Sequence, residues 1–308
     1  MSDPAAAALG THATGAPPAV LAVTDDVATG DGARRRPKLG WFFWVCLSFV
    51  ALVVFGAIFA GVLPLQDPGL QTATQNGGPS AAHWFGTDDL GRDIFSRVVY
   101  GARVSLVVGF GAIGIGLLVG GTLGMLAGYR RGRTDSIVNA GSYVLLAFPA
   151  LIAVIAIVSF WGHQEWKIVL ILGIFSAPLL FRVIRAATLS CASRDFVTAA
   201  QALGATDRRI LAKEVFPNIA PAVISFSLIG VATIIVLEGS LAFLGASIDT
   251  NSGQIPSWGN MLNEGRTFLQ SDPWLTVFPA IAMFCFLLAL NFLGDRLRQH
   301  YDVGGVKL

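Results

Sequence analysis

Long apolar segments separated by short polar ones dominate the pattern along this chain. A run of about 20 mainly apolar residues is long enough to cross a bilayer as an α-helix. Six such runs are present, at about 41–63, 104–128, 138–160, 167–187, 221–245 and 274–294. Only residues 161–166 separate the third run from the fourth, which predicts a tight turn. We therefore predict an all-α fold, a polytopic membrane bundle of six transmembrane helices.

The composition supports a membrane protein and argues against other classes. Of 308 residues, 54% are hydrophobic and 13% are charged, whereas soluble domains carry about 25% charged residues. The net charge is only +2, so no nucleic-acid partner is expected. Cys46, Cys191 and Cys285 are far apart in the sequence, and we interpret them as packing residues rather than metal ligands. The lipid bilayer is the first partner that the sequence implies.

The chain begins with a segment unlike the rest. The first 33 residues are rich in Ala, Gly, Thr and Pro and cannot bury enough apolar surface to fold. We predict a disordered cytoplasmic tail at 1–40, a transmembrane domain at 41–303 and a short C-terminal tail at 304–308. The apolar run at 41–63 exceeds the roughly 7–15 residues of a signal-peptide core. It is therefore expected to be retained as the first span.

The distribution of Lys and Arg indicates the orientation. Six spans place both termini on the same side of the membrane. Only five of the 21 basic residues then fall on the opposite side, namely Arg92, Arg97, Arg103, Lys167 and Arg266. Because cytoplasmic loops are enriched in Lys and Arg, we predict a multi-pass protein of the cell (cytoplasmic) membrane with both termini cytoplasmic.

The stretch 195–217 is too polar to lie within the membrane core. Phe196, Ala199, Ala200 and Leu203 recur at i, i+3, i+4 and i+7, which is one face of a helix. Gly204 can end that helix because glycine readily takes a positive φ. A second short helix is predicted from Asp207 to about Phe216, capped by Thr206 and ended by Pro217, Asn218 and Pro221. The stretch is thus expected to form a bent cytoplasmic helix pair whose small residues leave a shallow depression for another protein.

A second polar stretch, 83–106, precedes the second span. It reads as a short turn followed by an amphipathic helix that enters the membrane. Its aspartates, at 88, 89 and 93, can pair with Arg92 and Arg97. A metal site is conceivable because His83 is close to the aspartates, but no defined ligand spacing is present, so no metal is predicted.

Glu238 is the acidic residue that lies well inside a predicted span. An intramembrane carboxylate is by default a functional hypothesis. We favour a structural bond to a neighbouring helix, and keep a substrate path and a proton relay as alternatives. The sequence carries no GxxxxGKS or GxxxxGKT phosphate loop, no HExxH and no GxSxG. No catalytic residue is therefore predicted, and the chain is interpreted as a transport protein rather than an enzyme.

The second span carries glycines every four residues, at 116, 120, 124 and 128. Such spacing gives one helix face almost without side chains and allows close helix approach in lipid. Packing within the bundle is the favoured interpretation. A subunit interface and a substrate path remain alternatives.

The stretch from Phe85 to Leu106 closely resembles the signature FGTDxLGRDxxSRxxYGARxSL of C-type permease subunits of dipeptide, oligopeptide and nickel ABC importers. Segments 237–245, 256–262, 273–279 and 291–297 resemble later parts of the same subfamily. The resemblance covers about residues 41–303. It implies the type I ABC importer permease fold.

The stretch 195–217 resembles the EAA loop of such permeases, which is where the ATPase subunit docks. Ala199, Ala200, Gly204 and Pro217 match the pattern in register, whereas Thr198 and Glu214 depart from it. The resemblance implies that ATP and Mg²⁺ are held by partner ATPase subunits and that this chain binds no cofactor. The residues expected to dock or couple are Phe196, Ala199, Ala200, Leu203, Gly204, Ala205, Thr206, Asp207, Arg208, Arg209 and Pro217.

Two further partners follow from the resemblance. One is a homologous second permease subunit that shares the translocation path. The other is an extracytoplasmic substrate-binding protein, with Pro256, Trp258 and Asn260 as possible contacts; a loop held at the interface by tryptophans is the alternative. The expected substrates are dipeptides or oligopeptides, with nickel or another small ligand as the alternative. A stand-alone secondary transporter coupled to protons through Glu238 is the hypothesis from a different class.

Overall fold

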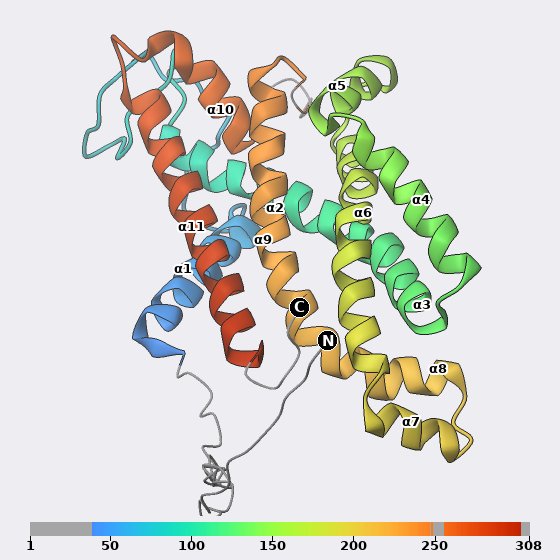
Figure 1. Ribbon diagram of the computed structural model, residues 1–308. Coiled ribbons are helices and arrows are strands. Elements are labelled where there is room, and N and C mark those ends of the chain that lie inside the picture. Colours follow the sequence, from blue (N-terminus) through green and yellow to red (C-terminus); the bar gives the residue numbers. More distant parts are fainter. Residues whose placement is uncertain (1–38, 247, 249–255, 303–308) are drawn as a thin grey trace, which may run out of the picture. The chain divides into compact units, whose positions relative to one another are not determined.

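The computed structural model describes residues 39–246, 248 and 256–302 (Figure 1). The predicted tails, up to residue 38 and from 303 onward, lie outside the described residues. Within the described part the chain is almost wholly helical, and a single antiparallel bridge joins Thr87 and Asp93. The predicted all-α class is therefore confirmed.

Five helical stretches are long and apolar enough to cross a membrane, and a bent pair of shorter helices brings the number to six if the pair is one span. The membrane bundle predicted from the sequence is thus confirmed. In chain order the elements are α1 (Gly40–Phe59), α2 (Ile94–Gly116), the π-helical η1 (Leu117–Gly121), α3 (Thr122–Arg130), α4 (Arg133–Ala147), α5 (Ala150–Trp161), α6 (Glu165–Ala192), α7 (Asp195–Ala202), α8 (Asp207–Arg209), the π-helical η2 (Ile210–Val215), α9 (Phe216–Phe243), α10 (Trp258–Gly265), the 3₁₀-helical η3 (Arg266–Phe268) and α11 (Trp274–Asp302).

The segment predicted as one span at 138–160 consists of two helices, α4 and α5, which form one span if the bent pair crosses the membrane together. The axes of α4 and α5 are bent by 81°. Phe148 ends α4 in an extended conformation, with φ −83° and ψ 132°, as expected for a residue that precedes a proline. Pro149 is the N-cap residue of α5, which begins at Ala150. The hydrophobic pattern continues through this break, because it reports burial or lipid contact rather than backbone direction.

The glycine face of the second span packs against α6. A Cβ atom on Gly120 would collide with the carbonyl oxygen of Ala177, and one on Gly124 would lie 2.8 Å from the carbonyl oxygen of Phe181. Only glycine allows two backbones to approach this closely. Packing within the bundle, the favoured interpretation, is therefore confirmed, and this face is occupied by the chain itself.

The expected helix end at Pro217 is wrong. Residues Asp207–Phe243, which include α8, η2 and α9, form one helix of 37 residues. The backbone N–H of Phe216 bonds the carbonyl of Leu211, five residues back. Such a π-helical turn is wider than an α-helical one, so the proline ring fits just after it without breaking the helix.

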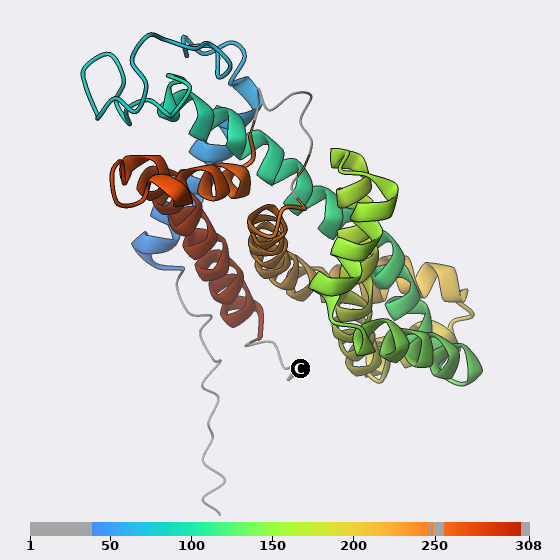
Figure 2. The same cartoon turned by 90° about the horizontal axis from the view of Figure 1, so that it is seen from above.

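Helix α9 lies at the centre of the packing. It contacts α2, α6, α10 and α11, and the view from above shows it between α11 and α6 (Figure 2). Figure 1 shows that α7 and α8 project at one end of α9, whereas α10 lies at its other end. One continuous helix therefore joins the two ends of the bundle.

The polar stretch before α2 forms the predicted ion pairs in part. Asp88 contacts Arg92, with Nε to Oδ2 at 2.7 Å, and also Arg97, with Nε to Oδ2 at 3.5 Å. Asp93 instead accepts a hydrogen bond from the backbone N–H of Ser96 and so caps α2. In the described part of the chain, no three His, Cys, Asp or Glu side chains are grouped so as to hold a metal ion.

Candidate coupling surface

Helices α7 and α8, which project from the bundle, form the hairpin predicted at the start of the 195–217 stretch (Figure 1). The turn between them is set by Gly204, whose φ is +77°, as the sequence predicted. The N–H of Gly204 bonds the carbonyl of Gln201, and the N–H of Ala205 bonds that of Ala200. These two bonds form a Schellman motif, in which a glycine ends a helix in the left-handed conformation.

A small apolar core fixes the hairpin to the bundle. Val197, Ile210 and Val215 are fully buried and cluster with Ile184 and Cys191 of α6. Val197 is not among the residues that the periodicity grouped on one face, which are Phe196, Ala199, Ala200 and Leu203. Helix α7 buries Val197 because it packs on α6 and η2 at once. The hairpin is thereby held as a rigid projection rather than a free loop.

The opposite face of the hairpin is exposed and partly apolar. The side chain of Leu203 is 88% exposed and that of Phe196 is 36% exposed. Exposed apolar side chains grouped on a projecting element are typical of a protein interface. Of the predicted docking residues, two are half-buried, Ala200 and Ala205, and the others are exposed: Phe196, Ala199, Leu203, Gly204, Thr206, Asp207, Arg208, Arg209 and Pro217.

Polar contacts at the edge of the hairpin join it to the end of α3. The Nε2 of Gln201 donates to the hydroxyl of Tyr129 at 3.2 Å, and that hydroxyl donates to Asp207 at 3.4 Å. Arg130 Nη2 lies 3.6 Å from Asp207 Oδ2. These groups are exposed, so each contact is weak on its own. Tyr129 and Arg130 could not be predicted as partners from local periodicity, because they lie more than 70 residues along the chain from Gln201 and Asp207.

Glu238 lies towards the far end of α9 from the hairpin and is 1% exposed. Its Oε1 accepts a hydrogen bond of 2.5 Å from the hydroxyl of Ser257. This hydrogen bond to a neighbouring element agrees with the favoured interpretation of Glu238 as a structural residue. Near it, Pro256 and Trp258 are buried and Asn260 is half-buried. The side chains of Pro256 and Trp258 therefore offer no surface to a binding protein in this structure.

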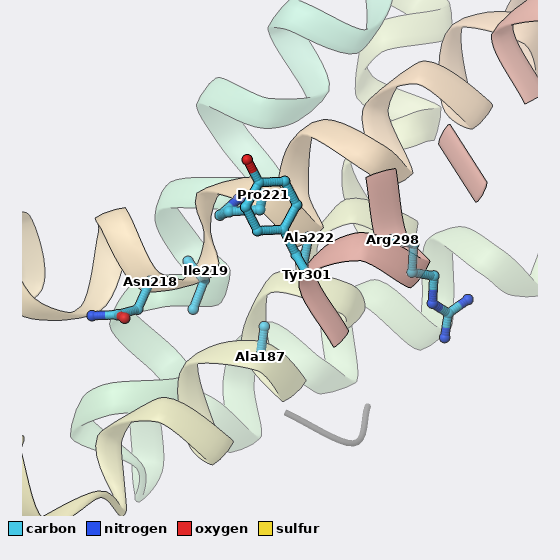
Figure 3. A pocket seen from close by; sticks show the side chains of 7 residues that line it. All are labelled: Ala187, Asn218, Ile219, Pro221, Ala222, Arg298 and Tyr301. Atoms are coloured by element: carbon cyan, nitrogen blue, oxygen red, sulfur yellow. The ribbon is translucent and has the colours of Figure 1, made fainter. Parts of the chain in front are cut away.

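Among the described residues, two of the cavities are lined by both α6 and α9, the helices on either side of the hairpin. The larger, of about 730 Å³, is lined by apolar residues of α2, η1, α3, α6 and α9 together with the hydroxyls of Thr122 and Ser227. The smaller, of about 40 Å³, lies between α6, α9 and α11. In the smaller one the polar ends of Asn218 and Arg298 point away from each other (Figure 3). Its polar groups therefore do not converge on one ligand.

Comparisons with known proteins place the chain in a family. Residues 120–303 match the family described as the binding-protein-dependent transport system inner membrane component. Among its relatives is the dipeptide transport system permease protein DppC of Alkalihalophilus pseudofirmus. The two are 39% identical over 258 residues, which is 84% of this chain and 83% of that protein. Another is the glutathione transport system permease protein GsiD of Pectobacterium atrosepticum, 39% identical over 227 residues, or 74% of each chain.

The fold is similar to that of a solved transporter. A structure of the MetNI methionine ABC transporter in an inward-facing conformation matches with a TM-score of 0.56 and 19% sequence identity, over 67% of this chain and 97% of that one. This likeness concerns the fold alone. The family match and the relatives together show that the chain belongs to the family of binding-protein-dependent transport system inner membrane components, the permease subunits of ABC importers.

Proposed function

We propose that this chain is the permease subunit of an ATP-driven importer of short peptides and that ATPase subunits dock on the α7–α8 hairpin. The observation that carries the proposal is the exposed apolar face of a rigid, projecting hairpin, with Leu203 88% exposed at its turn. The match of Ala199, Ala200 and Gly204 to the EAA pattern supports the same assignment. ATP and Mg²⁺ belong to the docked partners.

Coupling in this proposal is mechanical. Residues from Asp207 onward belong to the same 37-residue helix as the centre of the bundle. A displacement of the hairpin by ATPase closure therefore acts directly on α9. The buried contacts of Val197, Ile210 and Val215 with α6 make the hairpin move with both helices. Alternating access then follows from tilting these helices against the rest of the bundle.

The second permease subunit and the substrate-binding protein are the remaining proposed partners. A homologous permease subunit is proposed to share the translocation path with this chain. Among the described residues, most Lys and Arg fall in the segments at the hairpin end of the bundle, which supports a cytoplasmic hairpin. The opposite end would then receive an extracytoplasmic binding protein. Of the predicted contacts, Pro256 and Trp258 are buried, so only the half-buried Asn260 is accessible to that protein.

Short peptides are the proposed substrates because the two relatives named above are described as transporting dipeptides and glutathione. Nickel or another small ligand is the second candidate, favoured by the signature at 85–106 that peptide and nickel systems share. A proton-coupled secondary transporter would need Glu238 to exchange protons with water. Its burial and its bond to Ser257 do not favour that role.

The first experiment expresses the chain together with the products of its neighbouring genes and asks whether ATPase and permease subunits co-purify with it. Leu203→Glu and Ala199→Glu add a charge to the exposed face and are expected to release the ATPase while the second permease stays bound. Thr198→Glu is the matched control. It adds the same charge one position away, where the family pattern has Glu, and should retain the ATPase.

Two results would contradict the proposal. If both Leu203→Glu and Ala199→Glu keep the ATPase with wild-type stoichiometry, the hairpin is not the docking site. If the wild-type chain purifies alone and moves peptide into liposomes without ATP, the importer proposal itself is overturned.

A further inference from the structure

Helix α10 is inserted among the long helices at the end of the bundle opposite the hairpin. It contacts α2, α9 and α11. Its entry depends on glycines. A Cβ atom on Gly259 would lie 2.6 Å from the Cα of Gly239 on α9, and one on Gly101 of α2 would lie 2.9 Å from the carbonyl oxygen of Pro256. The start of α10 is therefore held between α2 and α9 at backbone contact.

The bond to α9 is made by the buried pair Glu238 and Ser257. The hydroxyl of Ser257 donates to Glu238 Oε1 at 2.5 Å and accepts from the backbone N–H of Asn260 at 3.2 Å. Ser257 is thus the N-cap of α10 and the partner of Glu238 at once. Both side chains are at most 1% exposed, so water cannot replace the bond cheaply.

The bonds to α2 are more numerous. The indole Nε1 of Trp258 donates to the carbonyl of Val98 at 2.9 Å, and its backbone N–H donates to the hydroxyl of Ser105 at 3.2 Å. At the other end of α10, Arg97 Nη2 lies 2.9 Å from Glu264 Oε2. Helix α10 is therefore fixed to α2 at both ends. Its buried side-chain bond to α9 is the one at Glu238, and the exposed Arg266, which directly follows α10, also donates to the carbonyl of Phe243 at the end of α9 at 3.2 Å.

These bonds determine how α10 responds when α9 moves relative to α2. Glu238 is 31 residues beyond Asp207 on one continuous helix, which corresponds to about 46 Å along the helix axis. A movement of α9 relative to α2 must either carry α10 along through Glu238 or break that bond. The carboxyl group lies in no open space where it could contact a substrate, since it is 1% exposed.

We propose that Glu238 is a positioning residue that fastens α10 to α9 through Ser257, so that displacement of the hairpin at one end of α9 moves α10 at the other. This inference rests on the proposed function. It assigns Glu238 neither to the substrate nor to a proton pathway. The decisive property of the residue is a hydrogen-bond acceptor at the right reach, not its charge.

The test separates reach from charge by using two substitutions at the same position. Glu238→Gln keeps the side-chain length and an acceptor oxygen but removes the charge. Glu238→Asp keeps the charge but is shorter by one methylene, so it no longer reaches Ser257. Ser257→Thr keeps the hydroxyl, and Ser257→Ala removes it. Each variant is purified with the partner permease and the ATPase, and assembly of the complex is checked by size-exclusion chromatography.

The readout is peptide transported per ATP hydrolysed in liposomes that contain the binding protein. Glu238→Gln and Ser257→Thr are expected to remain within about threefold of wild type. Glu238→Asp and Ser257→Ala should each lower the ratio about tenfold or more, the effect expected when a buried hydrogen-bonding group is left without its partner. The double variant Glu238→Asp/Ser257→Ala should be no worse than either single one, because both remove the same bond.

Three outcomes overturn the inference. Wild-type coupling in Glu238→Asp would show that the bond is not needed. Loss of coupling in Glu238→Gln with normal coupling in Ser257→Ala would show that the charge matters instead. Additive losses in the double variant would show that the two residues act separately. Failure of the wild-type complex to use ATP would instead overturn the proposed function, before any variant is compared.

Discussion

The turn at Gly204 allows a quantitative test of the hairpin. Its φ of +77° lies in the left-handed region, and a Cβ atom built there would meet no described atom within 4 Å. A substitution at this position therefore acts through backbone conformation and not through a steric clash. Gly204→Val places a β-branched side chain in a region that such residues avoid. Gly204→Asn is the matched control, since asparagine tolerates this region and is similar in size.

The size of the effect follows from the backbone. A non-glycine residue in the left-handed region costs about 1–3 kcal/mol, which lowers the population of the docking-competent hairpin about 5- to 150-fold. The Schellman bonds of Gly204 and Ala205 would be lost with the turn. The buried contacts of Val197 lie before the turn, so the bundle itself should still fold.

The assay compares ATPase affinity and transport per ATP in purified complexes. Gly204→Val is expected to weaken ATPase binding about 5- to 150-fold and to lower transport in proportion. Gly204→Asn should stay close to wild type. Equal affinities for the valine variant, the asparagine variant and the wild type would refute the argument that the left-handed turn shapes the docking surface.

The remaining predictions concern packing within the bundle. Gly120→Ala should destabilise the chain by about 1–3 kcal/mol or more, because its Cβ would collide with the carbonyl of Ala177; the measurement is the yield of folded protein in detergent. Gly114→Ala is its control, since no described atom lies within 4 Å of that Cβ, and it should fold at least as well as wild type. Trp258→Phe keeps an aromatic ring but removes the Nε1–H that bonds the carbonyl of Val98; that carbonyl lies within α2, so the denaturation midpoint should fall in line with a loss of about 0.5–1.5 kcal/mol. An unchanged midpoint would contradict that role for the indole N–H.

The sequence-based predictions were correct where a position requires a property that only one residue type has. The left-handed conformation of Gly204 and the close packing at Gly120 both follow from the absence of a Cβ atom. They failed where two prolines with the same chemistry behave differently. Pro149 follows a break in the helix, whereas Pro217 lies inside a continuous one, because a π-helical turn precedes it. The local sequence at 210–215 does not predict that π-helical turn.

The exposure and burial of the predicted site residues agree with the sequence-based expectations only in part. The docking face was predicted from local helical periodicity, and most of its residues are exposed as expected. The burial of Trp258 was not predicted, because a tryptophan between two spans is also typical of a membrane interface. Its position depends on Val98 and Ser105, more than 150 residues earlier in the chain. Such long-range pairs leave no periodic signal in a single sequence.

The π-helical turn at Ile210–Val215 also fixes the angular phase between the two parts of the long helix. A π-helical turn amounts to one extra residue inserted into an α-helix, and one residue corresponds to a rotation of about 100° about the helix axis. Side chains at 207–209 therefore point in directions that the periodicity of α9 does not give. Deleting one residue from this turn would restore uniform α-helical winding and rotate the hairpin around the bundle, so the length of this segment determines the direction in which the docking face points.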